Sequence, residues 1–242
     1  PNLTIASANV GGTLTLVDTG TIGQGGAITA ATLVADGTSV TLTDTGNEIG
    51  TANLTATGDA SLADTSALNI SGADVGGTLT LISNGTIGQT GAITAATLVA
   101  DGTSITLTDA GNEIGTANLT ASGDASLYDV SALTVGGVNV TGNLTLVDSG
   151  TIGQNGTIIA STLTANGTSL TFTNSGNQIG TANLTASGNA SLTDASNLTI
   201  ASANVGSTLT LVDTGTIGQT GAITAGTLNA NGTSLTFTNS GN

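Results

Sequence analysis

Apolar and polar residues alternate along short segments of the chain, as in Thr13-Leu14-Thr15-Leu16 and Val40-Thr41-Leu42-Thr43. Alternation with a period of two, rich in β-branched residues, predicts strands with one buried face and one solvated face. Glycine, often next to Asp, Asn, Thr or Ser, separates these segments and predicts tight turns in which glycine adopts positive φ angles. No segment keeps a helical period, so the sequence predicts an all-β protein.

The alternating pattern repeats every 65 residues. Related phrases open at Leu3, Leu68, Leu133 and Leu198, and the motif TIGQ begins at Thr21, Thr86, Thr151 and Thr216. The repeat units are therefore residues 3–67, 68–132, 133–197 and 198–242, and the last is incomplete. Repetition at a fixed period is typical of stacked architectures, in which each unit buries its apolar face against its neighbours. We expect residues 1–242 to form a single continuous β-solenoid segment of a longer array.

Apolar landmarks within one repeat predict a finer period. Ile5, Ile28, Ile49 and Ile70 open similar segments at spacings of 23, 21 and 21 residues. This pattern predicts a right-handed parallel β-helix of about 11 rungs of about 22 residues, with three rungs per repeat and Ile stacked over Ile. A disordered polar chain and an array of small β-sandwiches are the alternatives. The first does not explain the constant apolar register, and the second does not explain the sub-period.

Composition narrows the possible partners. Apolar residues make up 38% of the chain, but there are only one Tyr, two Phe and no Trp, so the core is expected to be aliphatic. All fifteen charged residues are acidic, and the formal net charge is −15. Without cations, binding to nucleic acid or to an anionic membrane surface is not expected. No apolar run is long enough to insert into a membrane, and the absence of Cys excludes disulfides.

The acidic residues near turns are the candidates for a metal site. Asp44, Glu48, Asp109 and Glu113 flank equivalent turns, and carboxylates beside backbone carbonyls can bind calcium. In the third repeat the corresponding residues are Asn174 and Gln178. A required ligand should not change to an amide, whereas Asp and Asn serve equally well in turns. We therefore expect no metal ion or other cofactor, and interpret the acids as solvated turn residues.

Catalytic groups are also missing. No His, Lys or Arg is present to activate a Ser or Thr nucleophile or to stabilise an oxyanion. A pair of carboxyl groups can hydrolyse glycosides, but no repeat carries an acidic cluster that the others lack. The sequence predicts no catalytic residues and no enzymatic activity.

The phrase GNEIGTANLTASGDASLYDVSALTVGG at Gly111 to Gly137 carries a family resemblance, as do Ser191 to Ile200 and Gly77 to Thr94. These segments resemble the repeats of filamentous-haemagglutinin-type giant bacterial exoproteins and related adhesins. The resemblance covers the whole chain, because every repeat contributes. It implies a right-handed β-helical shaft that is exported to the bacterial surface, with adhesive tips outside the shaft.

Together these observations predict a structural shaft or filament segment of a secreted bacterial surface fibre or adhesin, located outside the cell. The expected partners are further repeats or end-to-end copies of the same chain. The alternative is that the shaft itself binds glycans on host or neighbouring cells. Such a shaft should carry a groove or patch that breaks the repeat, and we expect none from the sequence.

Overall fold

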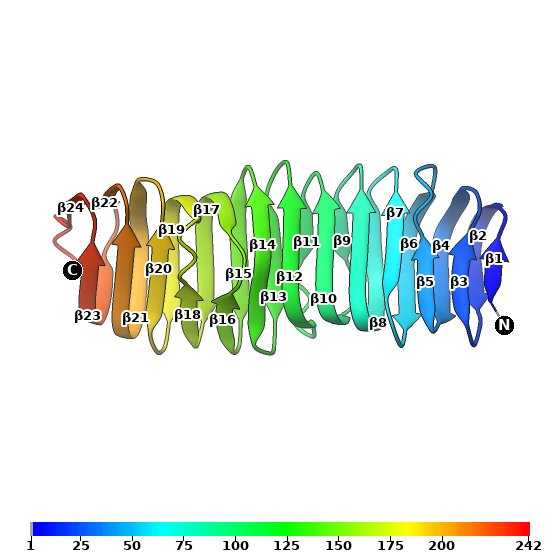
Figure 1. Cartoon of the computed structure of the whole chain (residues 1–242), viewed down its shortest axis with the longest axis horizontal. Coiled ribbons are helices and arrows are strands. Elements are labelled where there is room, and N and C mark those ends of the chain that lie inside the picture. The colour runs from blue at the N-terminus through cyan, green and yellow to red at the C-terminus, as the bar shows by residue number, and fades with distance from the viewer. Residues whose placement is uncertain (1) are drawn as a thin grey trace. The chain divides into compact units, whose positions relative to one another are not determined.

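A computed structural model describes residues 2–242 (Figure 1). The chain divides into two compact units, unit 1 up to Thr120 and unit 2 from Ala121 to Asn242. Each unit is a β-solenoid whose described strand pairs are parallel, and residues 2–242 contain no helix. The predicted fold class is therefore confirmed. Within the same residues, no helix is long and apolar enough to cross a membrane.

Unit 1 is built from twelve strands within its described residues, coloured blue to green in Figure 1. They are β1 (Leu3–Ile5), β2 (Ala8–Val17), β3 (Thr21–Gln24), β4 (Ile28–Gly37), β5 (Ser39–Leu42), β6 (Glu48–Ala56), β7 (Ala60–Asp64), β8 (Leu68–Ser83), β9 (Ile87–Gln89), β10 (Ile93–Gly102), β11 (Ile105–Leu107) and β12 (Glu113–Ala121).

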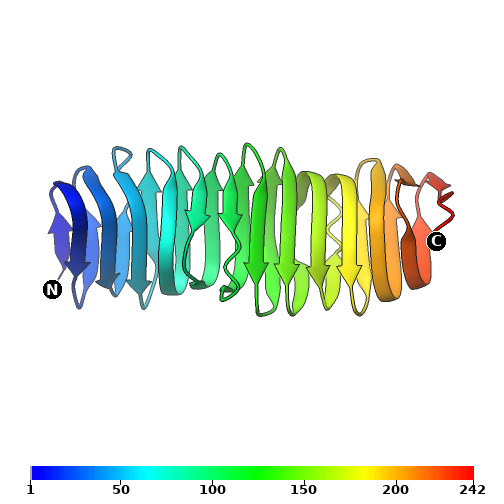
Figure 2. The same ribbon diagram turned by 180° about the vertical axis from the view of Figure 1, so that it is seen from behind.

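Unit 2 also has twelve strands, which Figure 2 shows from behind. They are β13 (Ala125–Asp129), β14 (Leu133–Val140), β15 (Asn143–Asp148), β16 (Thr151–Gln154), β17 (Ile158–Gly167), β18 (Ser169–Phe172), β19 (Gln178–Ala186), β20 (Ala190–Asp194), β21 (Leu198–Asp213), β22 (Thr216–Gln219), β23 (Ile223–Asn231) and β24 (Ser234–Thr236).

The coil is shorter than the sequence pattern predicted. Leu3, Ile22, Val40, Ala60 and Leu79 pair in succession, at spacings of 19, 18, 20 and 19 residues. The two units together hold about 12 coils of about 19 residues, not 11 of 22. The predicted spacing was wrong because it compared similar segments, and similar segments are not stacking partners. Ile49, for example, pairs with Ala30 rather than with Ile28.

The prediction of three rungs per repeat was also wrong. Three coils of about 19 residues leave about eight of the 65 residues over, so the next repeat starts elsewhere on the coil. In unit 1 the short strands β1, β3, β5 and β7 are followed in their stack by the C-terminal half of β8 and then by the long strand β10. The long strands β2, β4 and β6 are followed by the N-terminal half of β8, which then pairs with the short strand β9.

The same exchange occurs inside unit 2. The short strands β16, β18 and β20 lead to the C-terminal half of β21 and then to the long strand β23. The long strands β17 and β19 lead to the N-terminal half of β21 and then to the short strand β22. The 16-residue strands β8 and β21 are thus the places where short and long strands change stacks.

One ladder of the core alternates large and small side chains. Leu16, Ala35, Leu54 and Ala73 follow one another along one buried ladder. The predicted stacking of Ile over Ile is therefore wrong for this ladder. Alternating Leu and Ala lets successive coils interdigitate at high packing density, which explains how the core is filled almost without aromatic residues.

Glycine serves close approach rather than unusual backbone angles. No described glycine has a positive φ, so the predicted left-handed turns are not found. A Cβ at Gly156 would overlap the backbone carbonyl of Gly136 in the coil below, and one at Gly221 would overlap the carbonyl of Ala201. Glycine is needed at these corners because the neighbouring coil leaves no room for a side chain.

Candidate functional site

The glutamine of TIGQ and the asparagine 23 residues later form a reciprocal pair. Gln24 Nε2 donates to Asn47 Oδ1 at 2.8 Å, and Asn47 Nδ2 donates to Gln24 Oε1 at 3.0 Å. Asn47 Oδ1 also accepts the Ile28 N–H at 2.9 Å, while its Nδ2 donates to the carbonyls of Leu42 and Ala63 at 3.1 and 3.0 Å. We call this arrangement the amide clamp. It recurs at Gln89–Asn112, Gln154–Asn177 and Gln219–Asn242.

The amide clamp explains the two most constant motifs as structural features. Asn47, Asn112 and Asn177 are fully buried, and the partners of Asn47 come from its own coil and from both neighbours. A buried amide needs such complete pairing, because an unsatisfied polar group in the core is costly. The constant 23-residue offset was visible in the sequence, but its pairing was not recognised.

The calcium candidates form turns. Asp44 Oδ1 accepts the Gly46 N–H at 2.8 Å, and Asp109 Oδ1 accepts the Gly111 N–H at the same distance. Asn174 makes the equivalent bond to the Gly176 N–H at 2.9 Å, although it has no charge. Glu48 and Glu113 are exposed, and no group of three potential ligands among Asp, Glu, His and Cys occurs within residues 2–242. The geometry therefore favours the turn interpretation, and the absence of a metal remains a prediction.

Five aspartates contradict the interpretation of the acids as solvated residues. The buried ones are Asp64, Asp129, Asp148, Asp194 and Asp213. Asp194 Oδ1 accepts the N–H of Ile179 at 2.7 Å, and its Oδ2 accepts the N–H and hydroxyl of Ser196, both at 2.9 Å. The carboxylate thus satisfies the N–H of Ile179 near the start of β19 and the N–H of Ser196 just beyond β20. These aspartates are structural.

Unit 2 contains two pairs of buried aspartates, and the two members of each pair lie side by side. Asp129 lies beside Asp148, and Asp194 lies beside Asp213, on adjacent strands. Burial raises the pKa of Asp148, the N–H groups of Gly150 and Leu133 oppose the rise, and the charge of Asp129 adds to it. Burial likewise raises the pKa of Asp194, opposed by hydrogen bonds from Ser196 and Ile179 and reinforced by Asp213. In unit 1 the equivalent pair is Asp64 and Ser83, so this repulsion is absent there.

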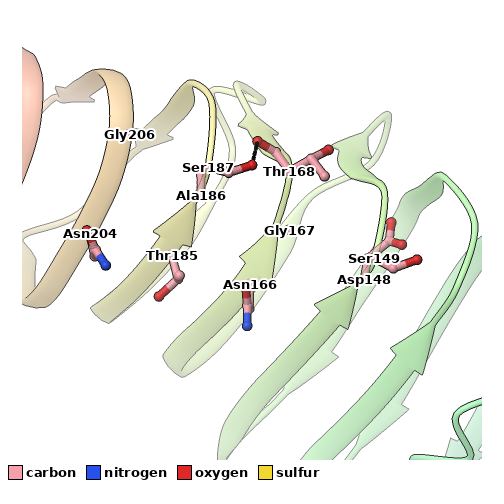
Figure 3. A pocket seen from close by; sticks show the side chains of 10 residues that line it. All are labelled: Asp148, Ser149, Asn166, Gly167, Thr168, Thr185, Ala186, Ser187, Asn204 and Gly206. Carbon is pink, nitrogen blue, oxygen red and sulfur yellow. Dashed lines mark hydrogen bonds between the residues drawn. The ribbon is translucent and has the colours of Figure 1, made fainter.

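Unit 2 carries an open groove of about 460 Å³ on its outer surface (Figure 3). It is lined by Asp148, Ser149, Asn166, Gly167, Thr168, Thr185, Ala186, Ser187, Asn204 and Gly206. Exposed side chains form two rows on either side of Gly167 and Ala186. We call Asn166, Thr185 and Asn204, which pair in register on neighbouring strands, the amide row. We call Ser149, Thr168 and Ser187 the hydroxyl row.

The hydroxyl row is already engaged in holding the coils together. Ser149 Oγ donates to the Val130 carbonyl at 2.6 Å, and Thr168 Oγ1 donates to the Gly150 carbonyl at 2.8 Å. Ser187 Oγ donates to the Thr168 carbonyl at 3.4 Å, as drawn in Figure 3. The side chains of both rows are exposed, but within residues 2–242 those of the amide row make no hydrogen bond to the protein. The amide row therefore offers the groove's accessible hydrogen-bonding groups.

Unit 1 carries the same groove with different charges. This second groove, of about 290 Å³, is lined by Val17, Asp18, Thr19, Asp36, Gly37, Thr38 and Thr57, each of which lies 130 residues before its counterpart in unit 2. Asp36, Thr55 and Asp74 pair in register where unit 2 has the amide row. Carboxylates thus replace both amides on an equivalent backbone.

The repeat is broken by apolar residues next to the unit 2 groove. Tyr128 is 39% exposed, and Val130 is 42% exposed. The residues at the Tyr128 position in the preceding and following repeats are Ala63 and Thr193. Tyr128 pairs in register with Val147, which pairs with Asn166 of the amide row. Sequence reasoning missed this patch, although the departure of Tyr128 from its repeat equivalents was readable.

The side chains of the unit 2 groove are suited to binding a ligand rather than to catalysing a reaction. Both oxygens of Asp148 accept backbone N–H groups, from Gly150 at 2.7 Å and from Leu133 at 3.1 Å. The chain has no His, Lys or Arg to act on a hydroxyl. The arrangement can donate and accept hydrogen bonds and present an apolar surface. That the protein is not an enzyme remains a prediction.

Comparison with known families gives one match that spans the chain. Residues 1–56, 57–121, 122–186 and 187–242 each match a family described as repeats of unknown function, DUF5649. The matched segments keep the 65-residue period, but they begin at other residues than the sequence repeats 3–67, 68–132, 133–197 and 198–242. Neither the curated proteins nor the solved structures contain a match to this chain.

Proposed function

The chain belongs to the DUF5649 family of repeats, and on that premise we propose that it is a structural shaft or filament segment of a secreted bacterial surface fibre or adhesin, without catalytic activity. The carrying observation is the Leu–Ala ladder, which runs from coil to coil, together with the amide clamp, which recurs once in each 65-residue repeat. Because each coil is bonded to its neighbours, length grows by adding repeats without any change in design.

The charge pattern supports a fibre that stays dispersed. All charged residues are acidic, so neighbouring fibres would repel one another and stay dispersed. The resemblance to filamentous-haemagglutinin-type exoproteins supports a location outside the cell, export and the fibre role. We propose no metal or other cofactor for the shaft, because the turn carboxylates make the same bonds as the amides that replace them.

The proposed partners are further repeats or copies of the same chain. In the last coil, Leu228 is 39% and Leu235 is 44% exposed. Their equivalents Leu163 and Leu170 are buried beneath the next coil, with exposures of 0% and 1%. A solenoid coil stacked on β23 and β24 would cover the same apolar positions and pair the open strand edges.

Immunogold electron microscopy of the source bacterium tests the proposal. Antibodies raised against residues 2–242 should label extended structures outside unpermeabilised cells. Labelling that appears only after permeabilisation would overturn the proposal, and a deletion strain supplies the background.

A second candidate function is glycan binding by the shaft itself. It is favoured by one observation, the groove of unit 2 beside the apolar patch that breaks the repeat.

A further inference from the structure

We propose that unit 2 binds a neutral, extended polysaccharide along a strip formed by the amide row in the groove and by Tyr128 and Val147 on the adjoining strands. This inference rests on the second candidate function and names its site and ligand class. It does not depend on the fibre role.

The strip is built by the register of the coils. Tyr128, Val147, Asn166, Thr185 and Asn204 occupy successive positions of one outward ladder. Neighbouring parallel strands lie about 4.8 Å apart, so the ladder extends about 19 Å. That length suits a short run of sugar rings lying across the coils, and along the strip Val147 is half-buried while the other four side chains are exposed.

Apolar and polar groups occupy different parts of the strip. Tyr128 and Val147 offer an aromatic and aliphatic surface on which the C–H face of a sugar ring can pack. Asn166 and Asn204 each present an amide that donates and accepts, and Thr185 presents a hydroxyl that does the same. Sugar hydroxyls also donate and accept, so the two sets of groups are complementary.

Charge decides the class of polysaccharide. The chain contains no cation, and Asp148 lies at the groove, so an anionic polymer would meet only negative charge. Unit 1 serves as an internal comparison, since Asp36 and Asp74 replace the amides of the row there. Carboxylates at pH 7 accept but do not donate, which reduces the match to sugar hydroxyls. We therefore assign neutral glycan binding to unit 2 and not to unit 1.

Binding of the whole chain to soluble β-glucan, mannan and dextran, measured by affinity electrophoresis and calorimetry, tests the strip. We expect binding to at least one of these neutral polymers and none to an anionic polymer such as alginate. Tyr128→Ala, which installs the residue found at position 63, should weaken binding at least about tenfold. The double variant N166D/N204D, which reproduces the charges of unit 1, should weaken it similarly.

A matched variant in unit 1 controls for the loss of an exposed apolar side chain elsewhere on the surface. Val17→Ala removes the exposed apolar residue of the other groove and should leave binding unchanged. Absence of binding to all three neutral polymers would overturn the proposal, as would full binding by Tyr128→Ala or by the double variant. Circular dichroism of each variant verifies that the fold is retained. None of these outcomes would alter the immunogold result, so the two proposals fail separately.

Discussion

The grooves of unit 1 and unit 2 share one backbone plan but not one surface chemistry. Asp18 and Asp148 occupy the same corner, and each accepts the N–H of the glycine two residues later, at 2.6 and 2.7 Å. The outward positions differ, because Asp36 in unit 1 corresponds to Asn166 in unit 2. In these two grooves the aspartate that satisfies the backbone is retained, whereas the two acidic side chains that face solvent in unit 1 are replaced by amides in unit 2. A repeat protein can therefore acquire a local binding surface without altering its scaffold.

The largest effect should come from breaking a feature that both units share. Asn177→Ala removes the centre of an amide clamp and leaves several buried partners unsatisfied, including the Ile158 N–H. Each such group costs about 1–3 kcal/mol, so we expect a loss of about 3–5 kcal/mol in the free energy of unfolding. Asn47→Ala should cost about the same in unit 1. Urea denaturation with hydrogen exchange measures both, and a loss below about 1 kcal/mol in either would contradict the role of the clamp.

The next effect concerns glycine at the corners. Gly156→Ala would drive its Cβ into the carbonyl of Gly136, which requires the backbone to move. We expect a loss of about 2–3 kcal/mol, in the range of strained backbone sites. Gly153→Ala, three residues earlier, meets nothing within 4 Å and should be neutral or slightly stabilising. Equal unfolding midpoints for the two variants would show that close approach does not select glycine here.

A smaller effect concerns the pH dependence of stability, which should differ between unit 1 and unit 2. The pKa of Asp148 and of Asp194 is raised in the folded state, so the folded state binds protons more tightly than the unfolded state. The resulting stabilisation is fully present below the unfolded pKa, near about 3.9, and is lost as the pH rises through the folded pKa. Unit 2 should therefore gain protection against hydrogen exchange between pH 7 and pH 4, after correction for the intrinsic exchange rate.

Asp148→Ser isolates this effect, because Ser83 occupies the equivalent position in unit 1. Ser83 Oγ accepts the Gly85 N–H at 3.0 Å, so a serine can keep part of the corner bonding. The variant should reduce the pH dependence of unit 2 stability. An unchanged pH dependence would show that the paired carboxylates are not its source.

The smallest effect on stability should come from the amide row. Asn166→Asp and Asn204→Asp change exposed side chains to the residues of unit 1. Each should shift the free energy of unfolding by no more than about 0.5 kcal/mol, even if it weakens glycan binding. A loss above about 1 kcal/mol would mean that the amide row belongs to the scaffold. Thermal unfolding of both variants measures the shift.

The fold class was readable from the sequence, but the coil was not. Alternation such as Thr13-Leu14-Thr15-Leu16 indicates a strand locally, and repetition indicates stacking. Coil length depends on which residues lie over one another, and Ile49 lies over Ala30 rather than over its look-alike Ile28. Sequence similarity relates residues that are 65 positions apart, whereas stacking brings together residues that are about 19 positions apart. The two do not coincide, because 65 residues are not a whole number of coils.

The candidate site was partly hidden for a different reason. Tyr128 departs visibly from Ala63 and Thr193, but its position beside Val147 and Asn166 depends on the coil register. The burial of Asp194 was equally hidden, because the same Asp-x-Ser turn pattern can face either water or a corner. Local sequence identifies such a turn, while its solvent exposure is set by neighbouring coils.

Cysteine cross-linking tests most directly the central claim that both units share one scaffold with a coil of about 19 residues. The chain has no cysteine of its own, so introduced pairs report without background. Thr32→Cys with Thr51→Cys in unit 1, and Thr162→Cys with Thr181→Cys in unit 2, join positions in register. Their Cα atoms should lie about 4.8 Å apart, within reach of a disulfide. We predict rapid oxidation of both pairs and none for Thr32→Cys with Asn53→Cys, which tests the 21-residue spacing. Faster oxidation of the Thr32→Cys, Asn53→Cys pair than of the two in-register pairs would contradict the shared coil. Oxidation of the in-register pair in only one of the two units would contradict it as well.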